Sequence, residues 1–183
     1  RAYVNPGNLN NEIGLPLAVI GAPEDARFAV YEMGAGKPGD IAYLCSIVTP
    51  QVALVNNVAA AHIERLGSLS GIAETKGAIY EALPDDGIAV VNADDTYAPL
   101  FVQRIGNRRV LRFGIDQDAD VRARDLSLDA NGSRFLLLSP MGRAEIHLPL
   151  PGRHGVMNAL AAAAMALAAG VDFEAIREGL QCA

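Results

Sequence analysis

The stretch Val52-Ala53-Leu54-Val55-Asn56-Asn57 places an unbroken apolar run directly before two asparagines. A short strand that is apolar at every position is typical of a parallel sheet covered on both faces, because neither side of the strand then meets water. In open α/β sheets, ligands bind beyond the carboxyl ends of the strands. The two asparagines, and the His62 that follows them in Ala59-Ala60-Ala61-His62, are therefore candidate site residues.

Strand-like apolar runs alternate with helix-like stretches in the first part of the chain. Strands are predicted at residues 27–33, 52–56, 88–92 and 109–113, and helices at residues 39–48, 70–83 and 97–105. This alternation indicates βαβ units and a parallel sheet. Residues 1–11 are polar and contain a Pro-Gly turn, so they are predicted to form a loop.

From residue 120 the pattern changes to short alternating runs separated by Asn131-Gly132 and Met141-Gly142. Asn-Gly between such runs is a strong hairpin signal, so a small antiparallel hairpin segment is expected near residues 120–150. An Ala-rich helix over residues 157–169 and a last helix opened by Asp172 follow. The expected fold class is α/β, with a mostly parallel sheet flanked by helices.

Composition limits the classes of protein to which the chain can belong. Its 183 residues are 51% hydrophobic, which suits one globular domain with a substantial core. The net charge of −6 disfavours a sequence-independent nucleic-acid binder, which needs a basic surface. The apolar stretches are too short for a membrane span and no signal peptide opens the chain, so we expect a cytoplasmic location.

Glu32 and His62 are the first candidates for chemistry. Glu32 follows a predicted strand and precedes Gly34 and Gly36, and its carboxylate could hold a hard cation such as Mg²⁺ or simply end a strand in solvent. His62 could be a metal ligand, a proton carrier or a hydrogen-bond donor to phosphate, although a lone histidine is more often structural.

Three further segments have both a functional and a structural interpretation. Lys76 lies beside an apolar helical stripe, where it either lays its stem on apolar surface or is modified to a carbamate that ligates metal. The acids of Asn92-Ala93-Asp94-Asp95 are turn residues or ligands. Gly152-Arg153-His154-Gly155-Val156-Met157-Asn158 precedes the Ala-rich helix and is a nucleotide-binding segment or an ordinary helix entry.

Segments along the whole chain match one known family in order and spacing. They are Gly7-Asn8-Leu9-Asn10-Asn11-Glu12-Ile13-Gly14-Leu15-Pro16, Glu32-Met33-Gly34-Ala35, Asn56-Asn57-Val58-Ala59-Ala60-Ala61-His62, Gly67-Ser68, Lys76-Gly77, Asn92-Ala93-Asp94, Leu150-Pro151-Gly152-Arg153-His154 and Asn158-Ala159-Leu160-Ala161-Ala162. Together they resemble the central domain of the Mur ligases, the ATP-dependent amide-forming enzymes of peptidoglycan synthesis. The folylpolyglutamate synthases share that fold but match these segments less closely.

The resemblance implies a reaction and a set of site residues. ATP would phosphorylate the carboxylate of UDP-N-acetylmuramoyl-tripeptide, and the amine of D-alanyl-D-alanine would then displace phosphate to form an amide. Glu32 and His62 would ligate or orient Mg²⁺ near the ATP γ-phosphate, and Lys76 matches a lysine that is carbamylated in several members. The remaining implied contacts are ATP at Arg153, His154 and Asn158, and the UDP-sugar peptide at Asn8, Asn10 and Asn11. The chain departs from the family pattern at Gly155, where an asparagine near the nucleotide is usual.

Residues 1–183 are expected to be a partial central domain. The phosphate-loop pattern Gly-x-x-x-x-Gly-Lys-Ser/Thr does not occur, so the upstream phosphate loop and the downstream C-terminal domain would be missing domains of the same polypeptide. We expect this fragment alone to lack ligase activity. The alternatives are a non-catalytic nucleotide-sugar or peptide-binding module, and a member of the same family with another amino-acid substrate.

Overall fold

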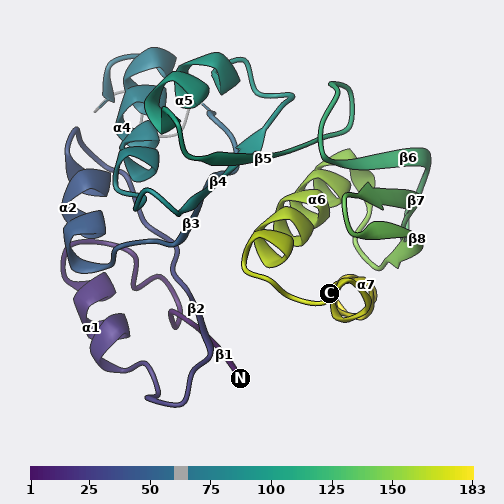
Figure 1. The fold of residues 1–183 in the computed structure, drawn as a ribbon, viewed down its shortest axis with the longest axis horizontal. Coiled ribbons are helices and arrows are strands. Elements are labelled where there is room, and N and C mark those ends of the chain that lie inside the picture. Colours follow the sequence, from purple (N-terminus) through teal and green to yellow (C-terminus); the bar gives the residue numbers. More distant parts are fainter. Residues whose placement is uncertain (60–65) are drawn as a thin grey trace.

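The computed structural model describes residues 1–59 and 66–183, so the predicted site residue His62 lies outside the described residues. In these ranges the strands form a parallel pair, β1-β2, and a larger sheet of order β3-β4-β5-β6-β7-β8 (Figure 1). The strands are β1 (Ala2–Val4), β2 (Phe28–Val30), β3 (Val52–Val55), β4 (Ile88–Asn92), β5 (Arg109–Gly114), β6 (Val121–Asp129), β7 (Gly132–Ser139) and β8 (Gly142–Leu148). The helices are α1 (Gly14–Ile20), α2 (Asp40–Ile47), α4 (Leu69–Glu81), α5 (Ala98–Ile105), α6 (Gly152–Ala168) and α7 (Phe173–Gln181).

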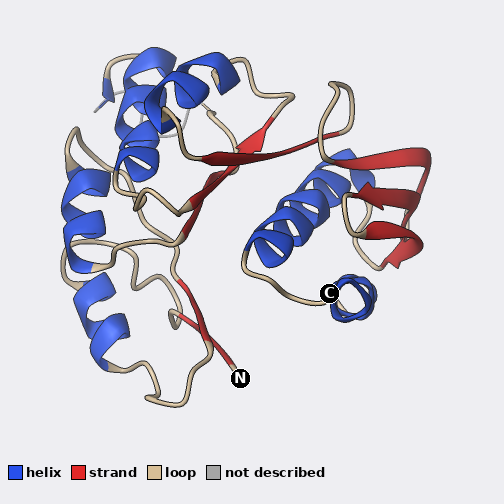
Figure 2. Cartoon of the chain, in the orientation of Figure 1, coloured by secondary structure: helices blue, strands red, loops and turns tan. Residues whose placement is uncertain are grey.

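The larger sheet is parallel at one end and antiparallel at the other. Strands β3 to β6 run parallel, with Val52 opposite Ile88 and Ile88 opposite Arg109. Strands β6, β7 and β8 form an antiparallel meander (Figure 2). The predicted α/β class and the hairpin segment near residues 120–150 are both confirmed.

Both faces of the parallel strands are covered by helices. In β4, Ala89 and Val91 pack with side chains of α4 and α5, whereas Val90 between them belongs to the core that contains α6. Each of the three side chains is at most 1% exposed. Successive side chains of a strand point to opposite faces, so burial on both faces requires the unbroken apolar run seen in the sequence.

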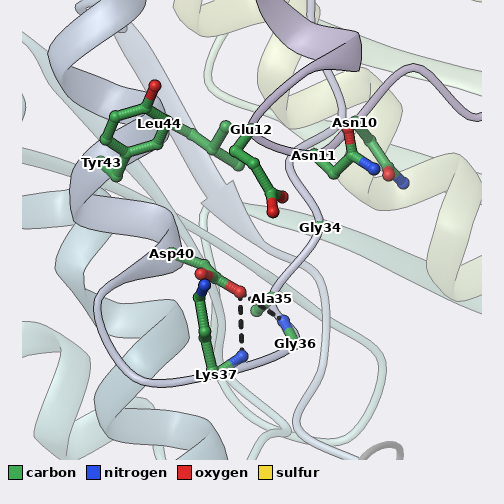
Figure 3. Close-up of a pocket in the computed structure, with 10 residues that line it drawn as sticks. All are labelled: Asn10, Asn11, Glu12, Gly34, Ala35, Gly36, Lys37, Asp40, Tyr43 and Leu44. Atoms are coloured by element: carbon green, nitrogen blue, oxygen red, sulfur yellow. Dashed lines mark hydrogen bonds between the residues drawn. The ribbon is translucent and has the colours of Figure 1, made fainter.

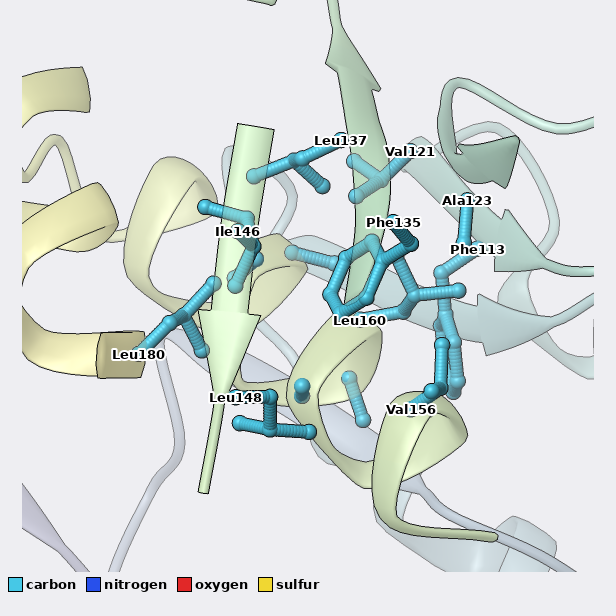
Figure 4. Close-up of a cluster of buried hydrophobic side chains, with 14 of the residues drawn as sticks. Phe113, Val121, Ala123, Phe135, Leu137, Ile146, Leu148, Val156, Leu160 and Leu180 are labelled. Atoms are coloured by element: carbon cyan, nitrogen blue, oxygen red, sulfur yellow. The ribbon is translucent and has the colours of Figure 1, made fainter. Parts of the chain in front are cut away.

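The hairpin end of the sheet forms a core with α6 and α7 (Figure 4). Leu137 and Ile146 from the sheet pack with Leu160 of α6, and all three are fully buried. Leu180 of α7 closes the same cluster beside β8. This core fixes α6 across the sheet and so fixes the position of its first turns.

A smaller core joins α1, α2 and α4. Met33 and Ala35, from the loop after β2, pack there together with Ala78 and Ile79 of α4. The loop that carries Glu32 and the helix that carries Lys76 thus pack against the same core.

The structure corrects the sequence prediction near the N-terminus. Residues 1–11 were predicted to be a loop, but β1 pairs in parallel with β2, with Ala2 opposite Phe28. Strand β2 is shorter than the predicted 27–33 and is not covered on both faces, because Val30 is 51% exposed. Helix α1 was not predicted, since its Gly14 and Pro16 interrupt the helical pattern.

Helix α6 begins earlier than predicted. It starts at Gly152 and not near residue 157, so Arg153 and His154 lie in its first turn. The two glycines of this segment obscure the start because glycine has low helix propensity. Of the helices that the structure describes, none combines the length and apolarity needed to cross a bilayer.

Tyr80 joins β3 to β4 at the end of the strands that leads to the candidate site. Its buried hydroxyl donates to the Val90 carbonyl at 2.8 Å and accepts from the Val55 amide at 2.9 Å. Burial raises the pKa of the Tyr80 phenol, which therefore stays protonated and able to donate.

Replacing Tyr80→Phe is expected to lower the free energy of unfolding by about 1 kcal/mol, because the two buried backbone groups lose their shared partner. Urea unfolding followed by circular dichroism measures the change. The exposed Tyr43 provides the matched control, and Tyr43→Phe should change stability by less than about 0.5 kcal/mol. Equal effects of the two substitutions would contradict the role given to the Tyr80 hydroxyl.

Candidate functional site

Polar side chains converge where β3 and β4 end. Asn56 donates its side-chain amide to Asn158 Oδ1 at 2.9 Å, and Asn92 donates its side-chain amide to the Asn56 carbonyl at 2.9 Å. Lys76 Nζ donates to the Asn57 carbonyl at 3.0 Å. We call these five residues the asparagine cluster. It brings two predicted site residues, Lys76 and Asn158, to the same edge of the sheet.

Lys76 is half-buried at this edge. Burial lowers the pKa of its ammonium group, and the nearby Asp95 carboxylate acts in the opposite direction. A lowered pKa increases the fraction of neutral amine, which is the form that reacts with carbon dioxide to give a carbamate. The environment is therefore compatible with the modification, whereas the unmodified ammonium cannot ligate a cation.

The start of α6 presents donors to the same region. Asn158 accepts through its oxygen, so its amide nitrogen is the side-chain atom that remains to donate to a ligand. The N-cap residue, Pro151, has no side-chain oxygen to offer the first-turn amides, and the positive end of a helix favours anions. Arg153 pairs with Asp116 at 2.5 Å, while His154 is exposed and its ring lies beside Gly152.

Asp94 and Asp95 hold backbone in place. Asp94 accepts from the amides of residues 115, 116 and 117 at 2.7 to 3.2 Å, and Gly114 approaches it so closely that a Cβ there would lie 2.8 Å from Asp94 Oδ1. Asp95 accepts from the amides of Val58 and Tyr97, each at 2.8 Å. Of the two interpretations of these acids, the structure supports turn residues.

Glu32 lies in a second group, on the loop after β2. Its exposed carboxylate accepts from Asn10 Nδ2 at 3.1 Å, and its backbone amide donates to Asn5 Oδ1 at 3.0 Å. Asn5 is only 7% exposed and was not predicted as a site residue. The signal for it was weak, because an asparagine before Pro6-Gly7 is also typical of an ordinary turn.

A cavity of about 680 Å³ opens between this loop and α2 (Figure 3). It is lined by residues 10–12, residues 34–37, and the α2 side chains Asp40, Tyr43 and Leu44. Asp40 Oδ2 holds the loop by accepting from the amides of residues 36 and 37, each at 2.9 Å. The cavity is large enough for a small part of a peptide or sugar substrate.

The predicted substrate residues have different surroundings. Asn8 is exposed, and Asn10 and Asn11 line the cavity. The Asn11 side-chain oxygen accepts from the amides of Ile13 and Gly14, and thereby caps the start of α1. Their contact with a substrate stays a prediction.

The Glu32 carboxylate suits a cation that takes most of its ligands from phosphate oxygens and water. Within residues 1–59 and 66–183, no three Asp, Glu, His or Cys side chains converge to hold a metal. Mg²⁺ usually takes one or two carboxylates and completes its shell with phosphate oxygens and water. Glu32, with one oxygen held by Asn10, fits that requirement.

The two groups are linked through packing. In the described part of the chain, no hydrogen bond joins Glu32 or Asn10 to the asparagine cluster. The link is the core formed by α1 and α2, against which Met33, Ala35 and side chains of α4 all pack. The backbone segments that carry Glu32 and Lys76 are therefore connected through this shared core.

Comparison with known proteins confirms the resemblance inferred from the sequence. The family described as the Mur ligase middle domain matches residues 3–166. The chain is 43% identical to the UDP-N-acetylmuramoyl-tripeptide--D-alanyl-D-alanine ligase of Escherichia coli over 175 residues, which is 95% of this chain and 39% of the relative. The chain thus spans about two fifths of the length of such relatives.

Solved structures show the same similarity in the backbone. MurF from Acinetobacter baumannii aligns over 100% of this chain and 40% of its own, with a TM-score of 0.96 and 35% identity. MurF from Thermotoga maritima in complex with ADP aligns over 96% of this chain and 41% of its own, with a TM-score of 0.82 and 29% identity.

Replacing Asp94→Asn is expected to lower the free energy of unfolding by about 2 kcal/mol, because an amide nitrogen would replace one of the oxygens that accept from residues 115 to 117. Chemical unfolding of the wild-type chain and the variant measures the difference. The control is Asp86→Asn at an exposed position, which should change stability by less than about 0.5 kcal/mol. An unchanged stability in Asp94→Asn would show that these hydrogen bonds do not hold the loop.

Proposed function

The chain belongs to the Mur ligase family, and we propose that it is the middle domain of a ligase that joins D-alanyl-D-alanine to UDP-N-acetylmuramoyl-tripeptide. The observation that carries this proposal is the match of the chain, over nearly its full length, to ligases of that name. The asparagine cluster and the Glu32 loop support it, because the first provides hydrogen-bond donors beyond the ends of β3 and β4, where a nucleotide would bind, and the second provides a carboxylate for its cation.

The proposed reaction has two steps. The terminal carboxylate of the tripeptide attacks the γ-phosphorus of ATP, which forms an acyl phosphate and releases ADP. The amine of D-alanyl-D-alanine then attacks the acyl carbon, phosphate leaves with the C–O bonding pair, and the amine loses a proton as the amide forms. Both steps bring anionic or electron-rich groups together, so they need positive charge and hydrogen-bond donors.

The residues of this chain would supply part of that environment. Asn158 would donate its side-chain amide to the nucleotide, with Arg153 and His154 beside it in the first turns of α6. Glu32 would hold Mg²⁺, which screens phosphate charge when bound. His62 is proposed as its partner from the resemblance alone. Lys76, as a carbamate, would add a second negative ligand at the asparagine cluster.

We further propose that other parts of the same polypeptide complete the site. The chain contains no Gly-x-x-x-x-Gly-Lys-Ser/Thr segment, so the loop that wraps the ATP phosphates would come from outside residues 1–183. A C-terminal domain would provide another wall of the site. A cytoplasmic location in a bacterium fits soluble nucleotide substrates.

The complete ligase that contains this chain should release phosphate only when ATP, UDP-N-acetylmuramoyl-tripeptide and D-alanyl-D-alanine are all present. The 183-residue chain alone should release none, because the phosphate loop is absent from it. A phosphate-release assay with each component omitted in turn checks both expectations.

Single amino acids in place of D-alanyl-D-alanine serve as the acceptor control. Turnover with a single amino acid and none with the dipeptide would assign the chain to a different ligase of the family. Binding of the nucleotide sugar without phosphate release by the complete protein would instead support the non-catalytic binding module.

The carbamate on Lys76 can be tested directly by substitution, and the only other lysine within residues 1–183 is Lys37. With ¹³C-labelled bicarbonate, the complete ligase should show a carbamate resonance that is lost in Lys76→Arg. Lys37 is exposed and provides the matched control, so Lys37→Arg should keep the resonance. A resonance that survives in Lys76→Arg would place the carbamate elsewhere.

A further inference from the structure

We propose that Asn10 is a positioning residue that holds the Glu32 carboxylate in the orientation its cation requires. This inference rests on the proposed function, in which Glu32 is the cation ligand. The Asn10 side chain would then orient Glu32 in addition to making the predicted contact with substrate.

Asn10 contacts the Glu32 loop at two points. Its side-chain nitrogen donates to Glu32 Oε1 at 3.1 Å, and its backbone carbonyl accepts from the Gly34 amide at 2.7 Å. The two bonds lie on either side of Met33. Asn10 therefore fixes the backbone that carries Glu32 and the carboxylate itself.

Gly34 makes the orientation of the Asn10 side chain specific. A Cβ at position 34 would lie 3.1 Å from Asn10 Oδ1 and 3.3 Å from Asn10 Cγ, so the carboxamide packs against the glycine backbone. In this arrangement the amide oxygen lies beside Gly34, and the hydrogen bond to Glu32 comes from the amide nitrogen. A side chain at position 34 would displace the amide.

Asn5 holds the backbone of Glu32. It is buried, accepts from the Glu32 amide, and donates its own side-chain amide to the Leu9 carbonyl at 3.1 Å. With the backbone of Glu32 held in this way, the side-chain torsions are its remaining freedom. The bond from Asn10 is the contact that restricts them.

The chemistry of the pair suits a cation ligand. An amide is a neutral donor, so it orients the carboxylate without cancelling its charge as lysine or arginine would. It also occupies one oxygen, Oε1, and leaves Oε2 for the cation. Ligating carboxylates are commonly oriented by such hydrogen bonds, and loss of the partner typically weakens metal binding about 10- to 100-fold.

The test measures Mn²⁺ binding to the complete ligase in the presence of ADP, by electron paramagnetic resonance of the free ion. Four proteins are compared: wild type, Asn10→Ala, Glu32→Gln, and the double variant. Asn10→Ala should weaken binding about tenfold or more in the wild-type background and change it little in the Glu32→Gln background, because Asn10 acts through Glu32. Asn107→Ala, at an exposed position in the loop before β5, should bind as wild type does.

The four measurements separate the two proposals. If Glu32→Gln binds Mn²⁺ as tightly as wild type, Glu32 is not the ligand and the proposed role of the residue fails. If Glu32→Gln weakens Mn²⁺ binding but Asn10→Ala does not, Asn10 has no positioning role, although Glu32 remains the ligand. The same conclusion follows if Asn10→Ala lowers the Mn²⁺ affinity by the same factor in the wild-type and Glu32→Gln backgrounds. Asn10→Leu, which has a similar shape without a donor, is measured beside Asn10→Ala, and thermal unfolding confirms that each variant is folded.

Discussion

Burial of β3 and β4 on both faces is the constraint on which the rest of the structure depends. Helices α4 and α5 cover one face and α6 covers the other, so no polar side chain can lie within these strands without losing its water. Polar side chains can find hydrogen-bond partners only where the strands end, at Asn56 and Asn92. The asparagine cluster lies at this edge because the interior of the sheet excludes it.

The sequence predicted the elements whose pattern is local and failed where structure depends on distant partners. Unbroken apolar runs and the Asn-Gly turn identify β3, β4 and the β6–β8 meander. Strand β1 is three residues long and exists through pairing with β2, which no local pattern reveals. Helix α1 begins where the Asn11 side chain caps it, although its own residues have poor helix propensity.

The same distinction applies to the candidate site. Residue types at strand ends identified Glu32 and Asn56, because carboxylates and amides at such positions are typical of ligand sites. Lys76 lies within a helix, and the family resemblance pointed to it. Their partners were not predictable. The bond between Asn56 and Asn158 joins residues 102 positions apart, and the role of Asn5 appears only when β1 lies beside β2. Family resemblance supplied the order of these residues along the chain, whereas the contacts required the structure.

The close approach of Gly114 to Asp94 has a consequence for how such chains can diverge. A side chain at position 114 would collide with the carboxylate, and a shorter residue at position 94 would leave three backbone amides without their acceptor. A substitution at either position alone would therefore destabilise the loop after β5. In descendants of this sequence, the two positions would have to change together or not at all, although Asp94 lies in the turn after β4 and Gly114 lies at the end of β5.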